Sequence, residues 1–310
     1  MQSKGNYPIL LACSLLAACA SSPQRLIIDD VAVEPGCPGD GLLGAKVRCR
    51  EQVTDLAVLE QDLRLVLKDH PDQRVLVIFD IDDTLLTSTQ FLGSDRWYRW
   101  QSGEQMQMDK GEPVIITAAD EVACKFAKID VFYEFARFEA TQPEAPALVK
   151  HLQSRHAVMA LTSRSPGARG GTERELERAG YDFAASHLMP PERSLNFRKD
   201  ARGVSYANGI VMSTGLDKGE VLAEILALTG HQQAFDLILF VDDGAANLAD
   251  MNAAWKSRAV GLFLYHYTRI DKRVSAAELE GARRASRRLD DFLASAYPDR
   301  LADFRAQDCE

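Results

Sequence analysis

The chain has 310 residues, enough for one large domain or two small ones, and 46% of them are hydrophobic, which is typical of a globular protein with a core. Its formal net charge is −9, which disfavours nucleic-acid binding through bulk positive charge. No stretch approaches the roughly 20 consecutive apolar residues of a membrane-spanning helix, and this excludes a polytopic membrane protein.

The first residues have the pattern of an export signal. Lys4 precedes an apolar run over residues 8–18, which is too short to span a membrane but has the length of a signal-peptide core. The run ends in Leu16-Ala17-Ala18-Cys19, which resembles a bacterial lipobox, whose cysteine is lipid-modified and becomes the first mature residue. We therefore predict a lipoprotein signal peptide over 1–18 and lipidation at Cys19. A plain secretory signal is the alternative.

The resemblance to bacterial lipoproteins also implies a location. Ala20, and not an aspartate, follows Cys19, and in Gram-negative lipoproteins this implies the outer membrane. We expect the protein at the periplasmic face, held to the membrane by the N-terminal lipid only, because an acidic body tethered by acyl chains needs no basic patch to stay on the membrane.

Four cysteines besides Cys13 and Cys19 remain in a compartment that permits disulfides: Cys37, Cys49, Cys124 and Cys309. Cys37 and Cys49 flank a Gly/Pro-rich stretch and could pair with each other. Two free thiols at these positions are an equally favoured alternative.

A tether, a helix and a buried strand are predicted next along the chain. Residues 19–50 are rich in Gly, Pro and Ser and are predicted to be a tether with little structure. Apolar residues then recur on one face of a helix predicted over 51–70, which ends at Pro71. Residues 74–79 form a continuous apolar run, which is typical of a parallel strand buried on both faces.

A cap is predicted to follow this strand. Residues 86–140 lack the alternation of strands and are expected to be mainly helical. They contain a cluster of aromatic and basic side chains, Trp97, Tyr98, Arg99 and Trp100. This cluster either contacts a ring of a substrate or forms the small core of the cap, and the second interpretation is favoured.

Strands and helices alternate through the rest of the chain. Further strands are predicted at 157–161, 237–241 and 259–264, and a hairpin turn at Asn208-Gly209. Helices are predicted at 147–155, 172–180, 217–230 and 247–255, and a charged amphipathic helix at 275–297 is expected to dock on the core. This order predicts an α/β fold with a doubly wound, Rossmann-like parallel sheet and an active site at the carboxyl ends of its strands. The predicted parts are a core of 51–85 and 141–270, a cap of 86–140 and a C-terminal helical segment of 271–310.

Acidic side chains gather where the first predicted strand ends. Asp80, Asp82 and Asp83 follow it directly, and carboxylates this close raise one another's pKa unless a cation neutralises them. A ligand set made only of oxygen atoms favours Mg²⁺. Helix-capping acids are the alternative, but they explain only one or two of the three.

The ends of the other predicted elements add complementary groups. Asp242 and Asp243 follow the strand at 237–241, and Thr162 follows the strand at 157–161. Lys218 stands at a predicted helix N-terminus, where its charge and the helix dipole favour the same anion. Together these groups predict a site for a cation and a phosphate.

In this order the motifs resemble those of the haloacid dehalogenase (HAD) superfamily over roughly residues 70–265. They are the strand ending in Asp80-Ile81-Asp82-Asp83-Thr84, then Leu161-Thr162-Ser163-Arg164, Asp217-Lys218 and Val241-Asp242-Asp243. Within the superfamily, the chain is similar to an uncharacterised bacterial group with Phe91-Leu92-Gly93-Ser94 after the first motif. It is more distantly similar to lipid-anchored class C acid phosphatases, which typically have Glu at the position of Asp83.

The resemblance implies a role for each residue. Asp80 would be the nucleophile that forms an aspartyl-phosphate, and Asp82 the general acid and base. Thr162 and Lys218 would bind the phosphoryl group. Mg²⁺ would be held by the Asp80 side chain, the Asp82 carbonyl and one of Asp242 and Asp243, with Asp243 favoured. Arg164 either assists or is a surface residue that begins a loop.

The expected function is therefore Mg²⁺-dependent hydrolysis of a small-molecule phosphate monoester. Two alternatives stay open. One is a phosphotransferase that passes the phosphoryl group to an alcohol, and the other is a non-catalytic, envelope-binding lipoprotein on a HAD scaffold. Two retained aspartates, Asp80 and Asp82, argue against the last of these.

Overall fold

The computed structural model describes residues 47–306 and residue 309. The predicted signal peptide, the lipidation site Cys19 and Cys37 lie outside these residues. Within the described part of the chain, no helix has the length and apolar character needed to cross a membrane.

A central sheet of eight strands organises the molecule, in the order β1-β10-β9-β2-β5-β8-β7-β6. Its parallel strands are β1 (Val47–Val53), β10 (Gly261–Tyr267), β9 (Leu237–Asp242), β2 (Val75–Phe79), β5 (Ala157–Thr162) and β8 (Ile210–Met212). β7 (Arg202–Ala207) and β6 (Leu195–Lys199) extend one edge as antiparallel strands, and the predicted turn at Asn208-Gly209 joins β7 to β8. The predicted Rossmann-like α/β fold is confirmed.

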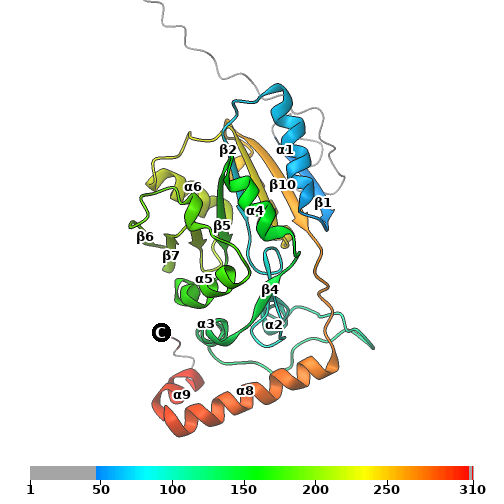
Figure 1. Cartoon of the computed structure of the whole chain (residues 1–310). Helices are drawn as coiled ribbons and strands as arrows, with labels where there is room; N and C mark the ends of the chain where they lie inside the picture. The colour runs from blue at the N-terminus through cyan, green and yellow to red at the C-terminus, as the bar shows by residue number, and fades with distance from the viewer. Residues whose placement is uncertain (1–46, 307–308, 310) are drawn as a thin grey trace, which may run out of the picture.

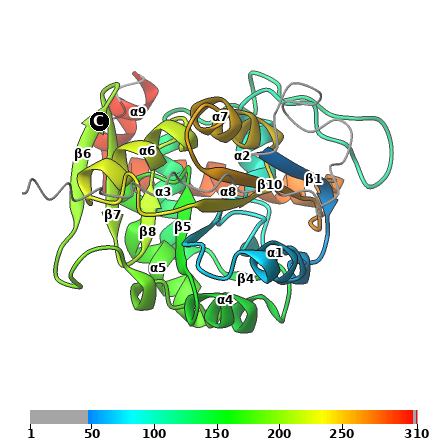
Figure 2. The ribbon, with the colours of Figure 1, turned by 90° about the horizontal axis from the view of Figure 1, so that it is seen from above.

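Helices cover both faces of the sheet (Figure 2). α1 (Ala57–Asp69), α4 (Ala145–Gln153) and α5 (Arg169–Arg178) lie on one face, and α6 (Lys218–Leu228) and α7 (Ala245–Trp255) lie on the other. Side chains of a strand alternate between the two sides, so Val77 and Phe79 of β2 pack on the first face while Leu76 and Ile78 pack on the second. This double burial explains why the central strands are continuous apolar runs. All of these helices except α1, and all the strands predicted, begin and end within three residues of the predicted bounds.

The N-terminal prediction is wrong at its boundary. The predicted tether over 19–50 includes the start of β1, and the predicted helix over 51–70 begins only at Ala57. β1 alternates apolar and polar residues over too short a length to stand out in the sequence. It becomes a strand because it pairs in parallel with β10 at the edge of the sheet, where otherwise unpaired backbone groups are available.

The cap rises from the carboxyl edge of the sheet on a small antiparallel ladder of β3 (Leu86–Ser88) and β4 (Phe138–Ala140). Between them lie α2 (Asp95–Gln101) and α3 (Lys125–Phe135), and residues 102–124 between the two helices form no further helix or strand. The prediction of a mainly helical cap is therefore wrong for most of the insertion, although both of its larger elements are helices. Trp97 and Trp100 are buried, and Trp97 packs edge-on against Phe132. The two tryptophans therefore form the core of the cap, which was the favoured of the two interpretations.

The C-terminal helices α8 (Ala276–Ala296) and α9 (Pro298–Arg305) pack against the cap and lie away from the sheet (Figure 1). Arg283 of α8 forms a bidentate ion pair with Asp120 of the cap at 2.7 and 2.9 Å, and a disulfide joins Cys124 to Cys309. The helix is docked and not free, as expected, but its ion-pair partners belong to the cap and not to the sheet. The insertion and the C-terminal segment together form a composite cap.

Candidate active site

The predicted acids converge at the carboxyl edge of the sheet. β2 and β9 are neighbours in parallel register, with Phe79 opposite Val241, so the residues that follow them lie side by side. One carboxylate oxygen from each of Asp80, Asp242 and Asp243 lies within 4.8 Å of the others. Oxygen atoms this close could share one cation, and oxygen-only ligands suit Mg²⁺.

Lys218 joins two of these carboxylates. Its Nζ donates to Asp80 Oδ1 at 2.5 Å and to Asp242 Oδ2 at 2.6 Å. Lys218 is the first residue of α6, whose N-cap Asp217 accepts a hydrogen bond from the backbone of Glu220. Burial acts to lower the pKa of Lys218, but Asp242 and Asp80 outweigh it and raise that pKa above its ordinary value. The buried side chain therefore stays an ammonium.

Asp80 is held in an environment that resists its ionisation. Its side chain is buried, and burial raises the pKa of this carboxyl well above its usual range, against the opposing effect of Lys218. Asp242 and Asp243 raise the pKa further. The negative charge of Asp242 and Asp243 thus opposes ionisation of Asp80, and a cation bound among the three carboxylates would favour their ionised forms.

The two aspartates after β9 differ in how many donors they already have. Asp242 Oδ1 accepts from the backbone of Gly244 at 2.8 Å and from Asn247 Nδ2 at 2.9 Å, while its Oδ2 accepts from Lys218. Asp243 Oδ2 accepts from Lys272 at 2.7 Å. Within the described residues no hydrogen bond reaches Asp243 Oδ1. Of the pair, Asp243 therefore has the freer oxygen for a metal ion.

Asp82 turns away from this triad and pairs with Arg164. The guanidinium donates to both carboxylate oxygens, at 2.9 and 2.8 Å, and to Thr172 Oγ1 at 2.9 Å. It also lies over the ring of Tyr133 in the cap, 3.9 Å from the ring centroid. Arg164 is buried, so it belongs to the site and is not a surface residue at the start of a loop. Its contact with a cap residue left no signal in the sequence.

Thr162 lies at the same edge of the sheet. β5 neighbours β2, with Ala160 opposite Phe79, and Thr162 ends β5 as a fully buried residue. Its Oγ1 accepts from the backbone N–H of Arg164 at 3.2 Å. The hydroxyl hydrogen is therefore free to point toward an anion held above the strand ends.

A second cluster of acids surrounds Lys272. This lysine was not among the residues predicted for the site. Oxygens of Asp83, Asp95 and Asp243 lie within 4.8 Å of one another, and Lys272 Nζ donates to all three carboxylates. Burial raises the pKa of Asp243 to about 7, although Lys272 acts in the opposite direction. Asp95 belongs to the cap and Lys272 to the segment after β10, so no local pattern links them.

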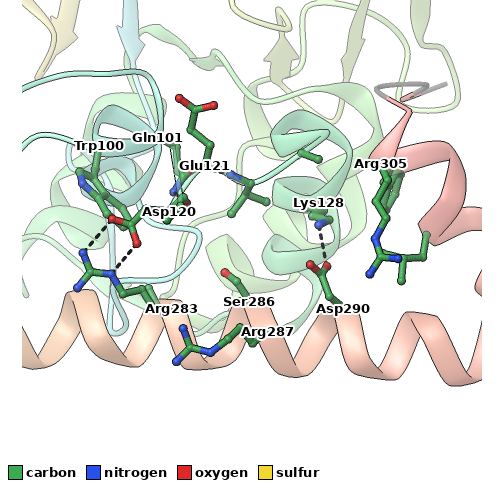
Figure 3. Close-up of a pocket in the computed structure, with 16 residues that line it drawn as sticks. Trp100, Gln101, Asp120, Glu121, Lys128, Arg283, Ser286, Arg287, Asp290 and Arg305 are labelled. Atoms are coloured by element: carbon green, nitrogen blue, oxygen red, sulfur yellow. Dashed lines mark hydrogen bonds and ion pairs between the residues drawn. The ribbon is translucent and has the colours of Figure 1, made fainter. Parts of the chain in front are cut away.

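The cap covers these groups. Asp80, Arg164 and Lys218 are each less than 5% exposed, and the cap backbone approaches the core closely at Gly171, where an added Cβ would lie 2.4 Å from the Tyr133 carbonyl oxygen. A cavity of about 210 Å³ lies elsewhere, between the cap and α8 and α9 (Figure 3), and none of the site aspartates lines it. Asp80, Arg164 and Lys218 are therefore largely shielded from solvent in this structure.

Comparison with known proteins gives a family but no activity. The family model described as "Protein of unknown function (DUF2608)" matches residues 57–295, from α1 to the end of α8. No curated protein matches the chain. The match covers the strand ends, the cap and Lys272, so every residue of the two acid clusters lies within it.

Proposed function

The chain belongs to the DUF2608 family of proteins of unknown function, and from the geometry of its site we propose that it is a Mg²⁺-dependent phosphomonoesterase that acts through an aspartyl-phosphate. One observation carries the proposal. The Lys218 ammonium bridges Asp80 and Asp242 at the point where three carboxylates converge within 4.8 Å. An attacking oxygen, a cation position and an anion-binding ammonium thus meet at one place, in the manner that the resemblance to the HAD superfamily implies.

The charge of the site supports a divalent cation. Six carboxylates, Asp80, Asp82, Asp83, Asp95, Asp242 and Asp243, face three cationic side chains, Arg164, Lys218 and Lys272. A phosphate ester would bring further negative charge into this buried region, where repulsion is stronger than in water. Asp80, Asp243 and the backbone carbonyl of Asp82 are the groups proposed to hold Mg²⁺, which would neutralise the developing charge on the phosphoryl oxygens.

The first chemical step belongs to Asp80 and Asp82. Lys218 holds Asp80 Oδ1, so Oδ2 is the oxygen proposed to attack phosphorus. A bond forms between Oδ2 and phosphorus while the bond from phosphorus to the ester oxygen breaks. Asp82, whose carboxylate must first leave Arg164 and take up a proton, gives that proton to the leaving oxygen, and the alcohol departs. Arg164 fixes the position of Asp82, and its contact with Tyr133 links that position to closure of the cap.

The second step regenerates the enzyme. Asp82, now a carboxylate, takes a proton from a water molecule, and the resulting oxygen attacks phosphorus. The bond between phosphorus and Asp80 Oδ2 breaks, and inorganic phosphate is released. Throughout both steps Lys218 and the Thr162 hydroxyl are proposed to bind the phosphoryl oxygens, because preorganised donors in a water-poor site stabilise developing charge strongly.

A hydrolysis assay tests the proposal. The purified chain, beginning at residue 19, is given a chromogenic phosphate ester with Mg²⁺ or with a chelator in its place. We expect turnover that requires Mg²⁺ and that Asp80→Asn abolishes, whereas Asp72→Asn, the same change at an exposed aspartate, keeps it. Absence of turnover on a broad panel of phosphate esters would favour the non-catalytic, envelope-binding alternative. Phosphorylation of an added alcohol faster than release of phosphate would instead favour the phosphotransferase.

We also propose that the protein is lipid-anchored at the periplasmic face of a bacterial outer membrane. The sequence Leu16-Ala17-Ala18-Cys19 supports this, as do the Cys124–Cys309 disulfide and the disulfide-bonded state of Cys49, which are typical of an oxidising compartment. Cys19→Ala is expected to move the protein from the membrane fraction to the soluble fraction of fractionated cells. Retention of the variant in the membrane would contradict the lipid anchor.

A further inference from the structure

Lys272 lies where a second cation would bind. Its Nζ donates to the carboxylates of Asp83, Asp95 and Asp243, at 2.8 Å for Asp95 and 2.7 Å for Asp243. Oxygens of these three side chains lie within 4.8 Å of one another, which is the same spacing as in the triad of Asp80, Asp242 and Asp243. The two triads share Asp243. The two acid triads are therefore adjacent, and a lysine of the chain itself lies among the carboxylates of the second one.

Three separate parts of the molecule meet at this ammonium. Asp83 belongs to the loop after β2, and Asp243 to the loop after β9, so both are core residues. Asp95 is the first residue of α2 in the cap. Lys272 itself comes from the segment that leads from β10 to α8. Without a cation between them, the three carboxylates would repel one another and push the cap away from the core.

The burial and the hydrogen bonds of the neighbouring carboxylates show that the Lys272 ammonium is held in this position. The Lys272 side chain is 27% exposed, while those of Asp83 and Asp243 are 7% and 12% exposed. Asp83 adopts a left-handed backbone conformation, with φ of 54°, and its other oxygen, Oδ1, accepts from Thr87 at 2.7 Å. A non-glycine residue with positive φ is uncommon and is held by its surroundings. Here the contacts with Thr87 and Lys272 fix the carboxylate.

We propose that Lys272 is a positioning residue that takes the second cation position of the site, so that the centre binds one divalent ion and the cap residue Asp95 is tied to the metal ligand Asp243. The inference deepens the proposed function and rests on it for the first cation position. A carboxylate has two oxygens and about four lone-pair directions, so Asp243 can accept from the ammonium at Oδ2 and still offer Oδ1 to a metal ion.

Counting bound Mn²⁺ tests the proposal without any assay of activity. Equilibrium dialysis of the wild-type protein at saturating Mn²⁺ is compared with that of Lys272→Met. We expect the variant to bind one ion more than the wild type, because removal of the ammonium leaves three convergent carboxylates. Lys150→Met, the same change at an exposed lysine of α4, is the matched control and should bind as many ions as the wild type.

The Mn²⁺ counts of the wild type and of Lys272→Met distinguish a failure of this inference from a failure of the proposed function. A wild type that binds no Mn²⁺, with a Lys272→Met variant that binds one, would support the role of Lys272 and contradict the proposed metal site. An equal count in wild type and Lys272→Met contradicts the role of Lys272 whatever the wild-type count is. A wild type that binds two ions contradicts it as well, because the ammonium would then not exclude the second ion.

A double variant covers the case in which Lys272→Met folds poorly. Lys272→Met with Asp95→Asn removes one charge of each sign from the cluster. We expect its thermal midpoint to lie above that of Lys272→Met alone, and its Mn²⁺ count to match the wild type. If Asp95→Asn brings no recovery, the carboxylates do not need the ammonium, and the inference is wrong. Added Mn²⁺ should likewise raise the midpoint of Lys272→Met more than that of Lys150→Met.

Discussion

At the scale of single residues, the site aspartates are chemically identical, and their different hydrogen-bond partners give them different proposed roles. Asp80 shares Lys218 with Asp242 in a buried triad, whereas Asp82 is fixed by the two-pronged contact of Arg164. Asp242 accepts from three donors, and Asp243 Oδ1 has no donor within the described residues. The proposed nucleophile, general acid and metal ligand are therefore distinguished by geometry and not by residue type.

The role of Asp82 predicts a dependence on the leaving group. An aryl ester releases a phenolate that needs little protonation, while an alkyl ester releases an alkoxide that needs it strongly. We expect Asp82→Asn to lower kcat for an alkyl phosphate by about 10²–10⁴-fold, the usual contribution of a general acid, and to lower phosphorylation of Asp80 by an aryl phosphate much less. Single-turnover kinetics on both esters measures the two effects. Equal losses on both would remove Asp82 from the role of general acid.

The excess of negative charge predicts an order of binding. Six carboxylates face three cationic side chains in and around the site, so inorganic phosphate should bind weakly until a divalent cation is present. Titration calorimetry of phosphate into the protein, with and without Mg²⁺, measures this. We expect at least a tenfold gain in affinity with Mg²⁺, which is about 1.4 kcal/mol. Tight binding of phosphate to the metal-free protein would contradict the charge balance.

At the scale of elements, the close packing of α6 against α7 sets the position of Lys218. Gly219 follows Lys218, and a Cβ at this position would lie 2.7 Å from Ala254 Cβ and 2.9 Å from the Asp250 carbonyl oxygen. Trp255 Nε1 also donates to the Gly219 carbonyl at 3.0 Å. The first turn of α6 therefore rests directly on the backbone of α7, which begins just after Asp242 and Asp243.

Two glycine substitutions test this packing. Gly219→Ala should lower the free energy of unfolding by about 1–3 kcal/mol, the usual cost of overpacking, and should reduce activity because Lys218 shifts with the helix. Gly281→Ala is the control: it lies within α8 with nothing near its added Cβ, and should raise the free energy of unfolding by about 0.5–1 kcal/mol. Urea unfolding measures both. A stable and active Gly219→Ala would show that α6 is free to move.

At the scale of the whole molecule, the cap consists of two segments that are far apart in the sequence. The insertion after β2 and the C-terminal helices contact each other through the Arg283–Asp120 and Lys128–Asp290 ion pairs. Lys272 joins this composite cap to the core. If the proposed function is right and the cap moves to expose Asp80, these contacts predict that α8 and α9 move together with the insertion.

The Cys124–Cys309 disulfide predicts a stability effect at this scale. It closes a sequence separation of 185 residues, and such a cross-link restricts the unfolded chain. Cys124→Ala with Cys309→Ala should lower the free energy of unfolding by about 2–4 kcal/mol, the typical range for a native disulfide. Urea unfolding of the oxidised wild type and the double variant measures this. The same stability in both would show that the ion pairs alone hold the composite cap together.

The sequence by itself determined the central strands of the sheet, most of the predicted helix bounds and the convergence of Asp80, Asp242 and Lys218 on one edge. Strands buried on both faces are continuous apolar runs, and the carboxyl ends of neighbouring parallel strands lie at the same edge of a sheet. Short segments of sequence are therefore enough to predict both features. Only the tertiary structure decided the partners of Asp82 and Asp83. Arg164 is 82 positions from Asp82 and Lys272 is 189 from Asp83, and pairs at such separations form only when the folded chain brings their elements together.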